Sequence, residues 1–258
     1  MKFRILLALT FFCFNANAAF LDEIQVYDGE INEPGEFGLE LHINTTVRGN
    51  STPEFEGQRT SQSGTRLTPE FTYGLSKTVE LGFYLPTIYT PGYGYELAGY
   101  KPRLKWLPIQ ADEQSPWSFG VNFEYSDLKW GMELPRKALE SRFIIGWENS
   151  HWSLAFNPIL SVALSDGQDR TPNFYYGARS IYKLDSSLSG VGLEYYQGVG
   201  PINSFPVNNS QAKQLFAIFE TKAERGFMNN FDVHFGVGYG WDSADTFTLK
   251  LILTPKLK

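Results

Sequence analysis

The chain has 258 residues and carries 22 Lys and Arg against 28 Asp and Glu, which gives a formal net charge of −6. This acidic balance argues against a nucleic-acid partner, which normally meets a basic face. A single cysteine, Cys13, excludes a disulfide framework and a cysteine metal site. Aromatic residues make up 16% of the chain although the mean hydropathy is only −0.26, a combination typical of strands with alternating apolar and polar side chains.

The first 18 residues have the three parts of a secretory signal peptide. Lys2 and Arg4 form a positive start, residues 5–14 are apolar, and Ala16-Asn17-Ala18 fits the small-x-small cleavage pattern. The apolar run is too short to cross a bilayer as a helix, which needs roughly 20 residues. We therefore predict cleavage after Ala18 and export from the cytoplasm, and Cys13 leaves with the signal.

Residues 19–35 form an acidic, irregular segment. Its acidic residues are Asp22, Glu23, Asp28, Glu30 and Glu33. The segment shows neither a helical nor a strand period. Three expectations remain open for it: a periplasmic segment, a partial plug of the domain that follows, or a disordered tail.

From residue 36 onward, stretches of about 8–10 residues alternate strictly between apolar and polar side chains, and Gly, Pro, Asn, Asp or Ser clusters separate them. In the first stretch Phe37, Leu39, Leu41 and Ile43 share one face, and His42 lies on the other. The pattern predicts strands at residues 37–48, 65–74, 78–88, 95–107, 117–126, 140–148, 152–164, 174–184, 188–198, 212–222, 230–240 and 245–254. The tenth is the least regular, because Phe216 and Ile218 share a face with Glu220.

The links between these strands alternate in length. Short links at residues 75–77, 149–151 and 185–187 alternate with long ones at 49–64, 127–139 and 199–211. Outer-membrane barrels combine short periplasmic turns with long outer loops. We therefore predict that residues 36–258 form an all-β, transmembrane, antiparallel up-and-down β-barrel of about 12 strands, with 10 or 14 as alternatives, in the bacterial outer membrane. The 108–116 link is long for a periplasmic turn and fits the scheme less well.

Aromatic residues gather beside the predicted inner turns. Such a ring matches the interfacial girdle of membrane barrels, in which amphipathic rings lie at the headgroup level. The predicted girdle consists of Trp106, Trp117, Trp147, Trp152, Tyr73 and Tyr182.

A row of charges is predicted on the lumen wall. Lys101, Arg103 and Lys105 alternate along one strand and therefore share its polar face. The neighbouring strands contribute Glu80 and Glu124. Arg142 lies on the next strand and completes the predicted pore-lining set. Either this charge stripe guides an anionic or polar solute, or its charges pair across a closed lumen.

Histidines on the polar faces raise the question of a metal. His42 and His234, with Glu40 and Asp232, offer nitrogen and oxygen ligands that suit a divalent cation. Polar wall residues are the simpler interpretation, and we predict no metal and no cofactor.

A His-x-Ser pair invites comparison with an outer-membrane phospholipase. His151 and Ser153 are followed on the same face by Asn157, and a Ser–His pair of suitable geometry can act as a nucleophile. The pair lies beside a predicted periplasmic turn, whereas that enzyme acts at the outer leaflet. We therefore assign no catalytic residue, and lipid hydrolysis remains an alternative.

Five segments of the mature chain have familiar sequences: residues 36–46, 67–75, 103–108, 156–160 and 192–196. Together they resemble a family of proteobacterial outer-membrane barrels that are labelled as phenol-degradation-pathway (MetA-type) or transporter-like proteins, and the likeness spans most of the mature chain. The resemblance implies an outer-membrane location and passage of aromatic or apolar small molecules, and it transfers no catalytic residue. One departure from outer-membrane barrels is the C-terminus, which ends in Pro255-Lys256-Leu257-Lys258 rather than on an aromatic residue.

The sequence thus predicts an outer-membrane channel or facilitator for small molecules. An occluded barrel with a structural or lipid-hydrolysing role is the alternative, and a surface adhesin acting through the 49–64 and 199–211 loops is the third. The expected partners are the lipid bilayer, the barrel-assembly machinery, periplasmic chaperones and an unidentified small solute.

Overall fold

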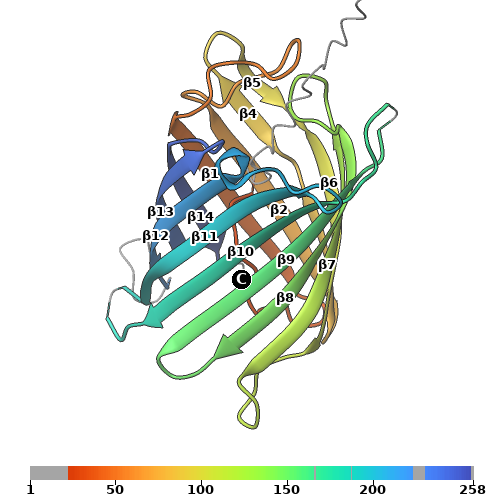
Figure 1. The fold of residues 1–258 in the computed structure, drawn as a ribbon. Helices are drawn as coiled ribbons and strands as arrows, with labels where there is room; N and C mark the ends of the chain where they lie inside the picture. Colours follow the sequence, from red (N-terminus) through yellow and green to blue (C-terminus); the bar gives the residue numbers. More distant parts are fainter. Residues whose placement is uncertain (1–22, 166, 187, 223–229, 257–258) are drawn as a thin grey trace, which may run out of the picture.

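The computed structural model describes residues 23–256 except 166, 187 and 223–229. The predicted signal peptide, residues 1–18, lies outside the described residues. The described chain forms one antiparallel sheet that closes on itself, since β1 pairs with both β14 and β2 (Figure 1). Its strands are β1 (Phe37–Arg48), β2 (Thr65–Ser76), β3 (Val79–Tyr84), β4 (Thr87–Thr90), β5 (Gly94–Leu97), β6 (Gly99–Ile109), β7 (Trp117–Leu128), β8 (Lys137–Glu148), β9 (Trp152–Ala163), β10 (Asn173–Lys183), β11 (Gly190–Pro201), β12 (Ala212–Thr221), β13 (Phe231–Asp242) and β14 (Phe247–Pro255).

These segments make up a 12-stranded wall, as predicted, because β3 continues into β4 and β5 into β6. β2 pairs with both β3 and β4, and β3 pairs with β6. The first break falls at Pro86, which has no N–H for the ladder, although its carbonyl accepts from the Ala98 N–H at 2.8 Å. The second falls at Gly99, where φ is +155° and a Cβ would collide with the Asp127 carbonyl.

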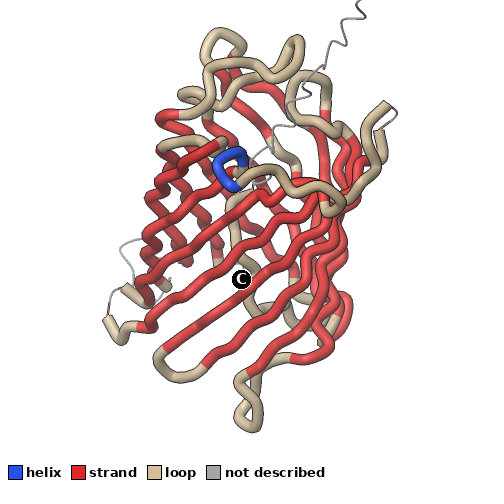
Figure 2. The backbone as a smooth tube through the Cα atoms, in the orientation of Figure 1, coloured by secondary structure: helices blue, strands red, loops and turns tan. Residues whose placement is uncertain are grey.

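Strand boundaries agree with the predicted ranges to within a few residues. The largest differences are β8, which begins at Lys137 rather than 140, and β11, which ends at Pro201 rather than 198. The long links lie at one end of the barrel, with β4 and β5, and the short turns lie at the other (Figures 1 and 2). We call the end with the short turns the inner end.

Successive side chains along each strand point alternately into the barrel and out of it. In β1, His42 and Asn44 point into the barrel and are buried. The opposite face of the wall exposes large apolar side chains, such as Leu104 on β6, Phe123 on β7 and Phe156 on β9. Because a water-soluble protein rarely exposes so continuous an apolar surface, this exterior fits a barrel surrounded by lipid. No described helix is both long and apolar enough to cross a membrane.

Residues 23–33, which we call the N-terminal strap, lie inside the barrel. The strap contacts wall strands from all sides: Asn32 bonds to Glu80 of β3, Tyr27 to Asn157 of β9, and the Ile24 carbonyl to Lys250 of β14. It runs from the inner end, beside the start of β1, to the middle of the lumen. The barrel core is therefore built partly from a segment that belongs to no strand.

An apolar cluster holds the upper part of the strap. Ile24 and Val26 are 3% exposed and pack against Phe216 and Ile218 of β12. This contact explains the irregular polar face predicted for the tenth strand, because its lumen side faces apolar strap residues rather than water. Burying each aliphatic side chain contributes about 1.5–3 kcal/mol. The remaining members of the cluster are Ala155, Ile159, Ile181 and Tyr196.

Candidate functional site

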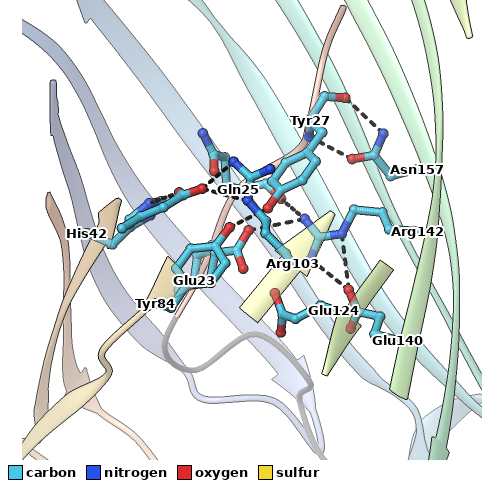
Figure 3. A network of polar contacts seen from close by, with 12 residues as sticks. Glu23, Gln25, Tyr27, His42, Tyr84, Arg103, Glu124, Glu140, Arg142 and Asn157 are labelled. Atoms are coloured by element: carbon cyan, nitrogen blue, oxygen red, sulfur yellow. Dashed lines mark hydrogen bonds and ion pairs between the residues drawn. The ribbon is translucent and has the colours of Figure 1, made fainter. Parts of the chain in front are cut away.

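The strap is fixed at mid-lumen by one asparagine (Figure 3). Asn157 of β9 accepts a hydrogen bond from the Tyr27 N–H at 2.7 Å and donates one to the Tyr27 carbonyl at 2.9 Å. Both groups are buried, with Asn157 at 1% exposure. The side chain thus mimics a neighbouring strand and satisfies backbone groups that have no ladder partner.

Arg142 of β8 is the main cationic contact to the strap (Figure 3). Its Nη1 donates to the Gln25 carbonyl at 3.1 Å and lies 3.5 Å from a Glu23 carboxylate oxygen. Its Nη2 pairs with Glu140 at 3.1 Å, and the guanidinium lies 4.4 Å from the centre of the Tyr27 ring. Burial raises the pKa of the Glu23 carboxyl, and the Arg142 charge opposes that rise.

Two further cations bind the strap, one from β14 and one from β10. Lys250, fully buried on β14, pairs with Glu194 and donates to the Ile24 carbonyl at 2.9 Å. Arg179 of β10 pairs with Asp28 of the strap and with Glu220 at 2.6 Å. A charge taken out of water needs such partners, so these contacts hold both the wall and the strap in one arrangement.

The predicted charge stripe on β6 does face the lumen, but carboxylates engage every member. Lys101 lies 3.4 Å from Glu124. Lys105 lies 3.2 Å from Glu80 and also donates to the strap at the Glu30 carbonyl.

Arg103, at the centre of the stripe, is shared by two carboxylates. Its Nη2 lies 2.7 Å from Glu80, and its Nε donates to Glu70 at 2.7 Å. Arg142 does not join this group, because its partners are Glu140 and the strap. The stripe is therefore a salt-bridged network in which no cation stands alone.

Sequence reasoning did not single out Glu70 or Asn157 as site residues. Both residues lie on the polar faces of predicted strands, so alternation alone indicated that their side chains point into the lumen. The role of Glu70 depends on Arg103, two strands away across the sheet, and the role of Asn157 depends on the strap, which no periodicity placed. The sequence offered one signal for the role of Asn157: an asparagine on a lumen face, in a chain whose acidic N-terminal segment has no strand of its own to pair with.

Two cavities lie at the two ends of the lumen. The inner cavity has a volume of about 480 Å³ and is lined by strap residues 25–32 together with wall residues near the inner end, including Thr72, Glu220 and Asp232. The outer cavity, about 470 Å³, is lined by residues near the long loops, including Ser126 and Asn173. The cavities have no lining residue in common. Tyr84 and Phe216, which are fully buried, line neither of them.

The predicted aromatic girdle residues lie in the wall beside the inner turns. Trp106, Trp117 and Trp152 are between 41% and 48% exposed. Neighbouring rings contact one another, as Trp152 and Tyr182 do at a centroid distance of 5.0 Å. The remaining predicted members are Tyr73, which is exposed, and Trp147, which is half-buried.

The two lumen histidines do not meet. His42 lies 3.1 Å from Glu70 and 3.5 Å from Glu40, whereas His234 of β13 contacts Glu194 and Glu220. The ligand atoms of Glu40, His42 and Glu70 lie within 4.8 Å of one another. Arg103 already occupies one Glu70 oxygen, and a guanidinium beside a carboxylate opposes binding of a second cation there. Asp232, the other candidate ligand, lines the inner cavity.

The structure does not assemble the His-x-Ser pair with its asparagine. His151 lies in the exposed turn before β9, and its Nδ1 shares a hydrogen bond of 2.9 Å with Ser150. Asn157 uses its amide on the Tyr27 backbone, on the buried side of the wall. Ser153, at the start of β9, thus has neither a histidine nor an asparagine partner among the hydrogen bonds found in the described chain.

Known structures share this architecture. An outer membrane channel from Pseudomonas putida F1 superposes with a TM-score of 0.56 at 13% identity, covering 90% of this chain and 99% of that one. The NanC porin gives a TM-score of 0.54 at 7% identity, covering 86% and 100%. No family model and no curated protein matches the sequence. The likeness confirms the fold, a closed antiparallel β-barrel, and the apolar exterior of the wall agrees with a location in a membrane.

Proposed function

We propose that this protein is an outer-membrane channel for small polar solutes, closed at mid-lumen by its own N-terminal strap. The observation that carries the proposal is the pair of cavities, about 480 and 470 Å³, on either side of the strap contacts. A barrel built only for structural support has no need of two chambers that each have room for many water molecules. Similarity to a protein described as a channel and to a porin supports the same role.

The strap is suited to being a movable element. Apart from the apolar contacts of Ile24 and Val26, it is joined to the wall by individual hydrogen bonds and ion pairs and not by a continuous ladder. The wall residues that make these bonds are Asn157, Arg142, Arg179 and Lys250. Each such bond contributes only about 0.5–1.5 kcal/mol net, or somewhat more with a charged partner. Withdrawal of the strap leaves the wall hydrogen bonds intact and joins the two chambers.

The solute class follows from the lining. The resemblance to transporter-like barrels implies aromatic or apolar molecules, whereas most residues around both cavities are charged, hydroxylated or amide side chains. Such a lining replaces the hydration of a polar solute and offers little to an apolar one. We therefore propose polar solutes, and comparing liposome uptake of phenol with that of a neutral sugar of similar size tests the choice.

The test of the channel function is single-channel conductance in a planar bilayer. The chain beginning at Ala19 is compared with a variant lacking residues 19–33. We expect brief or small openings with the strap and larger, longer openings without it. A variant lacking residues 111–115, in the exposed turn between β6 and β7, serves as the matched control and should behave like the parent chain.

Each variant is first checked for folding by the heat-dependent shift in electrophoretic mobility that barrels show. If both the parent chain and the strapless barrel fold and stay silent in the bilayer, the channel proposal is wrong and the closed, structural barrel is the correct alternative.

A further inference from the structure

We infer that the channel selects cationic over anionic solutes, because carboxylates outnumber cationic side chains in both chambers. This inference rests on the proposed channel function and specifies its solute class. It also runs against one of the two interpretations of the sequence, in which the charge stripe on β6 guides an anionic or polar solute.

The carboxylates beside the charge stripe on β6 neutralise its three cations, so little positive charge is left to attract an anion. Arg103 alone contacts two carboxylates, Glu70 and Glu80, and a second cation, Lys105, shares Glu80. Lys101 lies beside Glu124. An anion entering the lumen would have to displace these internal carboxylates, which are already held in place and partly desolvated.

The inner chamber carries an excess of negative charge. Its cationic lining residues are Arg103, Lys105, Arg179 and Lys222. Against these four, the wall contributes six carboxylates: Glu40, Glu70, Glu80, Glu194, Glu220 and Asp232. The strap adds two more, Asp28 and Glu30.

The outer chamber has the same sign. Lys101, which pairs with Glu124, is the one Lys or Arg among its described lining residues. The carboxylates in the same lining are Glu124, Glu133, Glu140 and Asp169, of which Glu140 pairs with Arg142. A solute therefore meets negative potential at both ends of the path. In a narrow lumen with low-dielectric walls, field lines are focused along the axis, so a surplus of a few charges controls which ions enter.

The inference is tested by the reversal potential in a tenfold KCl gradient, measured on the parent chain and on the variant lacking residues 19–33. We expect a potential of the sign for K⁺ permeation, with K⁺ favoured severalfold over Cl⁻. Tetramethylammonium and acetate, tested as the larger cation and anion, should separate in the same direction.

Two double variants locate the selectivity. Glu133→Gln with Asp169→Asn removes two charges from the outer chamber, and Glu40→Gln with Asp232→Asn removes two from the inner one. Each should move the K⁺ to Cl⁻ permeability ratio towards one, and each effect should shrink at high salt. As the control, Glu56→Gln with Glu113→Gln removes two charges that line neither chamber, and the ratio should not change.

The outcomes separate the inference from the channel proposal. Conductance with K⁺ selectivity that the chamber variants weaken supports both. Conductance that is unselective or favours Cl⁻ overturns the inference and leaves the channel intact. Silence of both folded chains overturns the channel proposal, and the inference falls with it.

Discussion

At the scale of single residues, side chains in the lumen make the hydrogen bonds that a neighbouring strand would otherwise make. Asn157 supplies both the acceptor and the donor that the Tyr27 peptide groups lack. Removing one partner from a buried hydrogen bond leaves the other group unsatisfied, which costs more than the bond itself contributes. The effect of changing Asn157 should therefore fall on the position of the strap and not on the wall.

We predict that Asn157→Ala shifts the balance between docked and free strap by about 1–3 kcal/mol, since two buried peptide groups lose their partner. Open probability in the bilayer should rise severalfold, while the heat-dependent mobility shift stays that of a folded barrel. Asn122→Ala is the matched control, because Asn122 is also a buried lumen asparagine but makes no hydrogen bond to the strap. Equal effects of the two substitutions would contradict the role given to Asn157.

At the scale of elements, the strap fits the wall closely at a glycine. A Cβ added to Gly29 would lie 2.5 Å from the Ser118 Oγ and 2.8 Å from its Cβ, so even a methyl group cannot be accommodated without movement. Ser118 is itself 2% exposed and lies on the rigid wall strand β7. Because the strap has no backbone hydrogen-bond ladder with a neighbouring strand, it is the strap and not β7 that must move to accommodate the added methyl group.

We predict that Gly29→Ala displaces the strap and raises the conductance, at a cost to docking of about 1–3 kcal/mol typical of overpacking. Adding Ser118→Gly removes the atoms that the new methyl group meets and should restore the parent behaviour. Single-channel recordings on the single and double variants test this. If Ser118→Gly fails to rescue, the close approach of Gly29 to the wall is not what positions the strap.

At the scale of the whole molecule, closure and the apolar exterior determine stability. Pairing of β1 with β14 closes the described sheet, so that among its segments β5, which pairs with β4 alone, is the part left with an unpaired edge. The outer face of the wall exposes large apolar side chains, so the folded barrel is stable only when hydrocarbon surrounds it. Phe123, which is 43% exposed near the middle of β7, lies at the depth where a charge is most costly.

We predict that Phe123→Arg destabilises the folded barrel in lipid by about 2–4 kcal/mol, the cost of a cation near the bilayer midplane. Denaturant titration in lipid vesicles measures it. Val207→Arg places the same charge in the loop before β12, where the native side chain is 69% exposed, and should cost little. Similar values for the two variants would place Phe123 outside the hydrocarbon layer.

The sequence by itself determined the wall. A period of two assigns each residue to one face, so alternation was enough to indicate the strands, the direction of the lumen charges and the barrel class. Even the stripe on β6 could be placed, because neighbours along a strand are fixed by local geometry. The breaks at Pro86 and Gly99 changed the strand segments without changing the faces.

Only the tertiary structure decided what fills the lumen. Which carboxylate meets which cation depends on register across several strands, and the position of the strap depends on contacts from all sides of the wall, as with Asn157, Arg142 and Lys250. The strap contacts join residues more than 100 positions apart, and neither they nor the ion pairs across the strands leave a local period. For this reason the sequence indicated a charged pore wall, whereas the fold revealed paired charges, an internal strap and two acidic chambers.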